Sequence, residues 1–282
     1  MQAQALLKSG DPTAALAALE QQVRKAPADA KQRIFLFQLL SVLGNWDRAL
    51  AQLNVAAEMD PTYLLDAQLY RAALQCEAFR AQVFRGERAP LIFGEPEAWV
   101  GSLVQAAQLQ AKGEHAAAVK LRAQALEAAP ATPGMVDGAS FTWIMDADPR
   151  LGPVFEMLIN GRYFWVPMHR VARLSIEPPV ELRDAVWSMA QVQWSNGGEA
   201  AVLMPARYPG SESAGAALQM ARQTDWVQLG PDLQEGKGQR LFATDEGDMP
   251  QLEVREIVFA GRGPQDASAQ GESMDVSGGQ HA

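Results

Sequence analysis

The 282-residue sequence is poor in the residues that form disulfides and transition-metal sites, with one cysteine and three histidines. The single cysteine, Cys76, excludes an internal disulfide and is typical of proteins from a reducing compartment. The histidines have no cysteine or second histidine at a ligand spacing, so we expect no metal site. No cofactor-binding pattern is found either, and none is expected.

Long apolar segments and an excess of basic residues are also missing. No run approaches the roughly 18 apolar residues that suggest a membrane-spanning helix. The net charge of -9 argues against binding to nucleic acid or to an anionic membrane, because either requires clustered lysine and arginine. The first residues lack the basic start and apolar run of a signal peptide. We therefore expect a cytoplasmic protein with no membrane or nucleic-acid partner.

The first half of the chain contains a 34-residue repeat. Four features recur at this interval: Gly10 and Gly44, Pro27 and Pro61, Leu19 and Leu53, and the Ala-Leu pairs at 15–16 and 49–50. This period is typical of tetratricopeptide (TPR) helical hairpins. Such hairpins stack into surfaces that bind other polypeptides. The repeat therefore favours a binding role over an enzymatic one.

Helical periodicity extends this interpretation to residue 130. Helices are predicted over residues 1–9, 12–26, 31–43, 46–59 and 62–85. Helix 31–43 is apolar nearly all round, which predicts a position between neighbouring helices. A weaker third copy of the hairpin has Gly113, Ala118 and Pro130 at matching places. We predict a TPR-like helical domain over residues 1–130.

The composition changes beyond the helical repeat. Residues 131–139 contain proline and glycine and predict a linker. Residues 140–260 combine strand patterns with turn sequences and predict a small, mostly antiparallel β domain with some helix. Residues 261–282 have little to bury and predict a disordered tail. The expected fold class is therefore α+β, with a TPR-like array followed by this domain.

Within residues 140–260, the turn sequence Asn160-Gly161 gives the clearest local signal. Asn-Gly readily adopts the positive φ angles of a tight hairpin turn, so the flanking segments 154–159 and 162–166 are predicted to pair. The other predicted elements are a second hairpin over 190–204, strands over 171–176 and 252–259, and a helix over 211–224.

Two acidic residues, Asp146 and Asp148, stand beside Arg150. Carboxylates at this spacing can bind a metal or act in acid–base catalysis. The alternative is a turn in which the Asp side chains accept backbone N–H groups next to Pro149. We favour the turn, because no third oxygen ligand follows at a loop-like spacing. No catalytic residue is therefore assigned.

Two other features also have structural interpretations. The glycine-rich basic segment 236–240 (GKGQR) lacks the rest of a phosphate-binding loop pattern and is predicted to be a flexible loop. Large aromatic residues in a small β domain usually form its core, and five of the seven tryptophans fall in this half: Trp143, Trp165, Trp187, Trp194 and Trp226.

An ordered set of motifs in the second half resembles the ImpE/TagJ (SciE-type) family of type VI secretion accessory proteins. Three of the motifs are residues 141–154 (FTWIMDADPRLGPV), 160–167 (NGRYFWVP) and 207–212 (RYPGSE). The resemblance covers roughly residues 1–260. Its motif residues have no assigned role; they are Trp143, Asp146, Asp148, Arg150, Arg162, Trp165, Arg207 and Tyr208.

The resemblance implies a cytoplasmic, non-enzymatic accessory protein of the contractile secretion apparatus. Its implied partner is the small sheath subunit (TssB/VipA-like) and, through the sheath, a ClpV-type AAA+ ATPase. Two alternatives remain open at this stage. One is a metal-dependent enzyme that uses Asp146, Asp148 and Arg150. The other is a TPR co-chaperone that recognises acidic C-termini.

A partner helix can lie in a concave helical surface, with its apolar side inward. On helix 31–43, Arg33, Gln38 and Ser41 can line such a groove with Phe37 between them. The alternative is that these are ordinary positions of a buried helix. A rival location is an exposed edge strand of the β domain, which can accept a partner strand.

Overall fold

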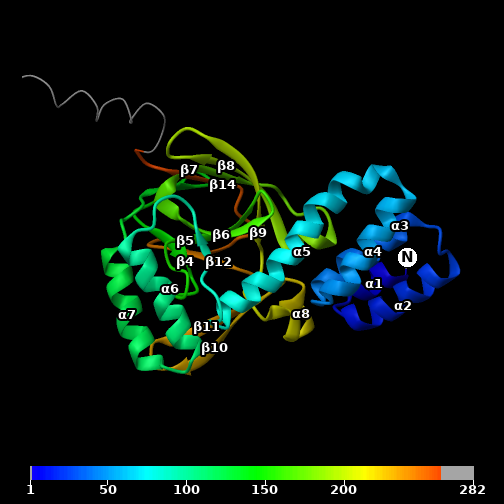
Figure 1. Cartoon of the computed structure of the whole chain (residues 1–282), viewed down its shortest axis with the longest axis horizontal. Helices are drawn as coiled ribbons and strands as arrows, with labels where there is room; N and C mark the ends of the chain where they lie inside the picture. The colour runs from blue at the N-terminus through cyan, green and yellow to red at the C-terminus, as the bar shows by residue number, and fades with distance from the viewer. Residues whose placement is uncertain (1, 262–282) are drawn as a thin grey trace, which may run out of the picture.

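The computed structural model describes residues 2–261, and its first half consists of packed helices (Figure 1). Five helices form the N-terminal array: α1 (Gln2–Lys8), α2 (Pro12–Lys25), α3 (Ala30–Val42), α4 (Trp46–Met59) and α5 (Leu64–Phe84). Helices α6 (Ala98–Ala111) and α7 (His115–Ala128) form the predicted third hairpin. No helix within residues 2–261 is long and apolar enough to cross a membrane.

The repeated residues explain why the first hairpins form and stack. Ala15 and Leu19 on α2, and the equivalent Ala49 and Leu53 on α4, are completely buried. Small and branched side chains at these places let neighbouring helices approach and fill the space between them. Gly10 has a φ of +86°, which ends the first helix at little steric cost. The 34-residue repeat therefore reflects the packing of successive helical hairpins against one another.

Within the described residues, nine strands form one sheet in the order β1-β6-β5-β9-β8-β7-β14-β2-β3. The pairing is antiparallel except between β1 and β6. The strands are β1 (Leu91–Ile92), β2 (Gly134–Val136), β3 (Ala139–Phe141), β5 (Val154–Ile159), β6 (Arg162–Pro167), β7 (Val171–Ile176), β8 (Trp187–Trp194), β9 (Glu199–Pro205) and β14 (Glu256–Phe259). At the predicted β5–β6 turn, Asn160 and Gly161 have φ angles of 50° and 72°. The positive angles confirm the turn that Asn-Gly predicts.

Two smaller sheets lie next to the main one. Strand β12 (Leu241–Thr244) pairs with β13 (Gly247–Pro250) and with β4 (Ile144–Asp146). Strands β10 (Thr224–Gly230) and β11 (Leu233–Gly238) form a separate hairpin. The pairing of β4 with β12 brings the Asp146 motif beside residues almost a hundred positions later in the chain. The sequence patterns did not reveal this contact.

Three local predictions were wrong. The predicted helix 211–224 is reduced to a 3-10 turn (Ser211–Ser213) and the four-residue α8 (Ala216–Gln219). The segment predicted as a linker, 131–139, contains β2, which pairs with β14 and β3. The segment 236–240, predicted as a flexible loop, includes the end of β11 and the buried Arg240. The predicted tail lies outside the described residues beyond Gly261.

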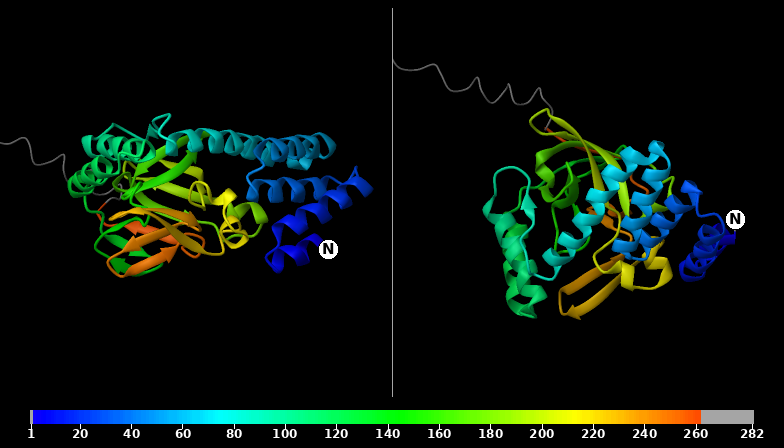
Figure 2. Two further views of the ribbon diagram at one scale, coloured as in Figure 1. Left: turned by 90° about the horizontal axis from the view of Figure 1, so that it is seen from below. Right: turned by 45° about the vertical axis from the view of Figure 1, so that its right-hand side comes forward.

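Helix α5 and the α6–α7 hairpin lie over one face of the main sheet, the first helices lie beside it, and the smaller strands lie on the other face (Figure 2). On the helical face, Tyr70 of α5 packs beside Trp187 of β8 in a core that continues into the TPR-like helices. On the opposite face, Phe155 of β5 packs against Phe242 of β12. Strand β5 is therefore buried on both faces. One hydrophobic core joins the helical array to the sheet.

Candidate functional site

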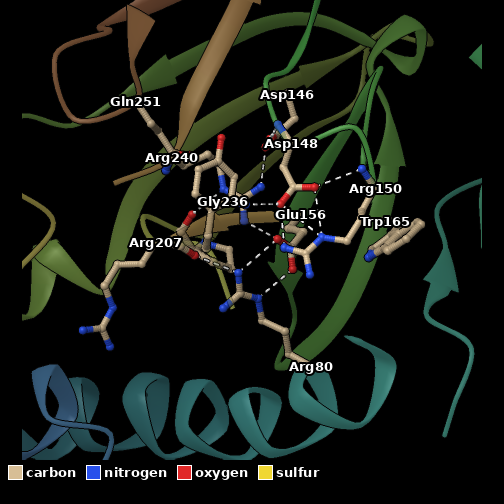
Figure 3. A network of polar contacts seen from close by, with 12 residues as sticks. Arg80, Asp146, Asp148, Arg150, Glu156, Trp165, Arg207, Gly236, Arg240 and Gln251 are labelled. Carbon is tan, nitrogen blue, oxygen red and sulfur yellow. Dashed lines mark hydrogen bonds and ion pairs between the residues drawn. The ribbon is translucent and has the colours of Figure 1, made fainter. Parts of the chain in front are cut away.

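A buried ionic network joins helix α5 to the sheet, and Glu156 of β5 lies at its centre (Figure 3). Arg80 of α5 donates to both carboxylate oxygens of Glu156, from Nε at 2.7 Å and from Nη2 at 3.1 Å. Arg240 and the hydroxyl of Tyr163 also donate to this carboxylate. Glu156 therefore has two arginines and a tyrosine as partners, all of them buried.

Tryptophan side chains extend the network along the interface between helix and sheet. Arg80 also pairs with Glu77, at 3.4 Å, and Glu77 accepts a 2.8 Å bond from the indole of Trp187. The indole of Trp165 donates to the Tyr163 hydroxyl at 2.8 Å. These bonds satisfy polar groups that would otherwise be costly to bury. The network is thus part of the shared core.

The Asp146 motif forms the turn that the sequence favoured. The backbone N–H of Asp148 donates to Asp146 at 2.8 Å, and that of Arg150 donates to Asp148 at 3.0 Å. The Arg150 side chain pairs with Asp148, which also accepts the N–H of Gly236, and Arg240 pairs with Asp146.

Both motif carboxylates are therefore occupied by arginine, which leaves them poorly available as metal ligands. Within residues 2–261, no group of three His, Cys, Asp or Glu side chains is arranged to hold a metal ion. The metal-dependent enzyme alternative thus has no support in this geometry.

Burial and arginine neighbours shift the carboxyl groups in opposite directions. Burial alone would raise the pKa of Glu156, but Arg80 and Arg240 lower the pKa to about 2. Burial raises the pKa of Asp146 to about 6, against the opposing effect of Arg240. Since Glu156 has two cationic partners and a tyrosine, its charged form is strongly favoured. Glu156 is therefore ionised in the folded protein at neutral pH.

This pKa shift predicts a measurable acid sensitivity. Glu156 has an ordinary pKa of 4.5 when exposed, so its contribution to stability is fully present above that pH and is lost as the pH falls towards 2. In this range the contribution falls by about 1.4 kcal/mol per pH unit. The stability difference between the wild type and Glu156→Gln should therefore shrink on acidification. Urea unfolding at a series of pH values measures this difference, and a constant difference would contradict the prediction.

Arg207, from the third family motif, links the two halves of the fold. It is buried, and it donates to the carbonyl oxygens of Val42 at 2.6 Å, Ser41 at 3.3 Å and Gln219. The first two carbonyls end α3 and the third ends α8, and helix C-termini favour a cation. Burial lowers the pKa of Arg207 to about 10. The role of Arg207 is to hold helix ends against the sheet.

The remaining motif residues divide between core and surface. Tyr208 is buried and accepts the N–H of Leu241 at 3.0 Å. Gly236 lies against the Tyr208 ring, where a Cβ atom would come within 2.3 Å. In contrast, Trp143 is 37% exposed, and the exposed Arg162 extends over the ring of Phe164. Most of the motif is therefore structural, and only these last two residues are accessible.

The groove expected on helix 31–43 is not open at the residues named for it. Phe37 packs against Tyr70, and the side chain of Gln38 donates to Glu181 at 2.9 Å. The Ser41 hydroxyl donates to the carbonyl oxygen of Phe37. All three residues are buried, Phe37 against α5 and Gln38 against the segment that holds Glu181, because both segments pack on α3. The apolar pattern of the helix predicted burial, but it could not show that a segment of the second half supplies part of the cover.

Arg33, the fourth residue of the expected groove, is only half-buried. Its guanidinium donates to the carbonyl oxygen of Pro27 and to the side chain of Gln52. The co-chaperone alternative needs a cationic clamp on this helix, and the basic residues of α3 are Lys31 and Arg33. Because Arg33 is engaged within the array, the geometry gives that alternative no support.

Comparison with known proteins agrees with this architecture. Residues 138–258 match the ImpE protein family, and residues 6–75 match the tetratricopeptide repeat family. A Pseudomonas aeruginosa protein, named type VI secretion system accessory component TagJ, is 46% identical over 260 residues, which cover 92% of this chain and 91% of that protein. The chain belongs to the ImpE/TagJ family. The family resemblance stated from the motifs is therefore confirmed.

The fold of this ImpE/TagJ protein is also found in a solved structure. A crystal structure of a Vibrio parahaemolyticus protein superposes with a TM-score of 0.83 at 26% sequence identity. The match covers 92% of this chain and 97% of that one. The predicted order, a TPR-like array followed by a mostly antiparallel sheet, is thus confirmed by the structure and by this relative.

Sequence reasoning missed five members of the network: Glu77, Arg80, Glu156, Tyr163 and Arg240. One signal was available. Glu156 stands in the run Val154–Ile159, where every other residue is apolar. A charge in a fully buried strand requires a partner. The identity of that partner could not be read, because Arg80 and Arg240 lie 76 and 84 positions away.

Proposed function

We propose that this chain is a non-enzymatic accessory protein of a type VI secretion system that acts as a cytoplasmic adaptor. In this proposal it binds a helical segment of the small sheath subunit and, through the sheath, is connected to a ClpV-type AAA+ ATPase. Membership of the ImpE/TagJ family and the name of the Pseudomonas relative support the system. The TPR-like array supports a role in binding a polypeptide.

The observation that carries the proposal is an apolar surface beside α5. Leu65 and Leu69 of α5 are 80% and 38% exposed. Leu69 and Met189 of β8 line a groove whose other walls come from α5 and from strands β5 and β9; we name it the α5 groove. Its lining residues are Leu69, Ala72, Ala73, Leu158, Asn160, Gly161, Met189, Ala201, Val202 and Leu203. Exposed apolar patches of this kind mark interaction sites.

The shape and chemistry of the α5 groove suit an amphipathic helix. Its lining is largely aliphatic, and Met189 also borders a second hollow that includes Val180, which is widely exposed. Apolar side chains one helical turn apart on a partner can occupy such hollows, with the polar face of the partner towards solvent. This location replaces the one expected on α3.

The rival mode, addition of a partner strand, has its best candidate edge at β10. Within the described residues the main sheet ends in β1 and β3, which have two and three residues and offer few hydrogen bonds. Strand β10 is longer, pairs only with β11 and exposes Val227 and Leu229. A long edge with apolar side chains can accept another strand. The experiment below separates the two surfaces.

Leu69→Asp should weaken binding of a sheath-subunit helix by at least about tenfold, because a charge in the groove loses solvation on binding. Isothermal titration with synthetic peptides that cover the helical segments of the small sheath subunit measures the effect. Leu229→Asp is the matched control: Leu229 is 37% exposed against 38% for Leu69, and it lies on β10. Its affinity should equal that of the wild type. Loss of binding in Leu229→Asp alone would assign the site to the edge strand instead.

The indirect connection to the ATPase requires a separate measurement. The full chain, immobilised, should retain a ClpV-type ATPase only when the small and large sheath subunits are also present. The Leu69→Asp variant should then lose both the sheath and the ATPase. Retention of the ATPase by the isolated wild-type chain would contradict an indirect link.

A further inference from the structure

Two of the motif segments, 141–154 and 207–212, meet α5 and β11 around another cleft, which borders the ionic network at Arg80. Its lining includes Arg80 of α5, Arg85 just after α5, Arg150 of the Asp146 motif, the 209–212 loop and Lys237 of β11. Two aromatic residues, Trp46 and Phe84, complete its walls. Figure 3 shows Arg80, Arg150 and Gly236 close together around the network. The adaptor proposal makes no use of this cleft.

Cationic side chains in the cleft come from separate parts of the chain. Arg80 and Arg150 are buried, and each contacts the ring of Phe84 from 5.7 and 5.0 Å. Arg80 is paired with Glu156, and Arg150 with Asp148 and Glu235. These pairs fix the two guanidinium groups in place. A cation held by its own partners is a preorganised donor for a further ligand.

Lys237 differs from the arginines because no carboxylate within residues 2–261 lies at ion-pair distance from its ammonium group. Its Nζ donates to the carbonyl oxygen of Pro209 at 2.7 Å, and an ammonium has two further protons to donate. Burial and then the neighbouring Arg150 lower the pKa of Lys237, against the opposing effect of the Glu235, Glu212 and Asp148 carboxylates. A half-buried ammonium beside a guanidinium is a place where an anion is stabilised.

The backbone is shaped to make room for this ammonium. Gly210 has a φ of +78°, and a Cβ atom at this position would lie 2.6 Å from the Lys237 Nζ. The glycine therefore allows the lysine to reach the carbonyl of Pro209 inside the cleft. The basic glycine-rich segment 236–240 therefore packs closely against the 207–212 motif at Lys237 and Gly210.

We propose that this cleft binds a small oxyanion, a phosphate or a carboxylate group, with Lys237, Arg85 and Arg150 as its donors. The acidic residues of the cleft are largely engaged: Glu77 with Arg80, and Glu235 with Arg150. Glu212 also lines the cleft, and repulsion between its carboxylate and a bound anion weakens binding, most for the most highly charged anions. The site is separate from the α5 groove, so it would stand if the adaptor proposal failed.

Titration of the full-length protein with inorganic phosphate, and separately with succinate, tests the site. Isothermal titration at constant ionic strength should detect binding of at least one of the two. Lys237→Met should weaken it by about tenfold or more, as expected for loss of a charge-assisted hydrogen bond. Lys120→Met, which removes an exposed lysine of α7, is the control and should bind as the wild type does.

Arg85→Gln provides a second variant. The variant should also weaken binding of the probe. Because the Arg85 side chain is exposed and pairs on the surface with Glu87, its replacement should leave the unfolding midpoint unchanged. Binding of phosphate alone or of succinate alone supports the site and identifies the ligand class. No binding of either probe, or equal binding by the wild type and Lys237→Met, would overturn the proposal.

Discussion

Glu156→Gln is expected to lower the free energy of unfolding by about 3 to 5 kcal/mol. The carboxylate of Glu156 is buried and neutralises Arg80 from α5 and Arg240 from the segment after β11. The amide keeps the size of the side chain but leaves both guanidinium groups short of a counter-charge in the core. Each arginine retains one other carboxylate, Glu77 or Asp146, so the fold should survive. Urea unfolding followed by circular dichroism measures the loss.

Glu87→Gln is the matched control for this prediction. Glu87 also accepts two bonds from one arginine, Arg85, but both side chains are exposed. Water screens such a pair, so its loss should leave the unfolding midpoint unchanged. If the two variants were equally stable, the buried network would contribute no more than a surface pair. The structural role given to Glu156 would then be wrong.

Trp165→Ala should also cost about 3 to 5 kcal/mol of stability, because it removes a large, completely buried side chain. Trp165 packs against Phe84 of α5 with ring centroids 6.1 Å apart. Its indole is a donor to the hydroxyl of Tyr163. Alanine would leave a cavity between α5 and β6 and would remove that donor. The change in the unfolding midpoint and in the slope with denaturant measures the effect.

Trp143→Ala controls for the loss of a motif tryptophan. Trp143 belongs to the same set of family motifs, but it is 37% exposed. Its replacement should change stability by less than about 1 kcal/mol, as is usual for surface positions. A large loss of stability in Trp143→Ala together with a small loss of stability in Trp165→Ala would contradict the division of the motif residues into core and surface.

Local sequence patterns predicted the elements whose defining contacts are made between residues close together in the sequence. The repeat positions Ala15 and Ala49 indicated the helical packing, because a TPR hairpin buries a face against the next hairpin. Asn160-Gly161 indicated the β5–β6 turn, since the required φ angles depend on those two residues. The turn at Asp146 was also readable, because its hydrogen bonds span only two residues.

Predictions failed where a distant segment supplied the partner. The helix expected over 211–224 has helical apolar spacing, but Ser211 accepts the N–H of Gly238 and Gln223 accepts the N–H of Gln239, and Thr224 begins a strand that pairs with β11. The segment 236–240 contains two glycines and looked flexible, yet Gly236 donates to Asp148 and Arg240 reaches Glu156. In both cases pairing across the fold overrides local propensity.

The sequence by itself therefore determined the class of the protein: a TPR-like array, a mostly antiparallel sheet and membership of the ImpE/TagJ family. Periodicity and turn chemistry are local, and they can be read along the chain. Only the tertiary structure decided which residues are available to a partner. Phe37, Gln38 and Ser41 were candidates for an open groove on helix 31–43, but all three are buried, with Tyr70 packed on Phe37 and Glu181 bonded to Gln38. Burial depends on contacts between distant segments, and this moved the candidate surface from α3 to α5.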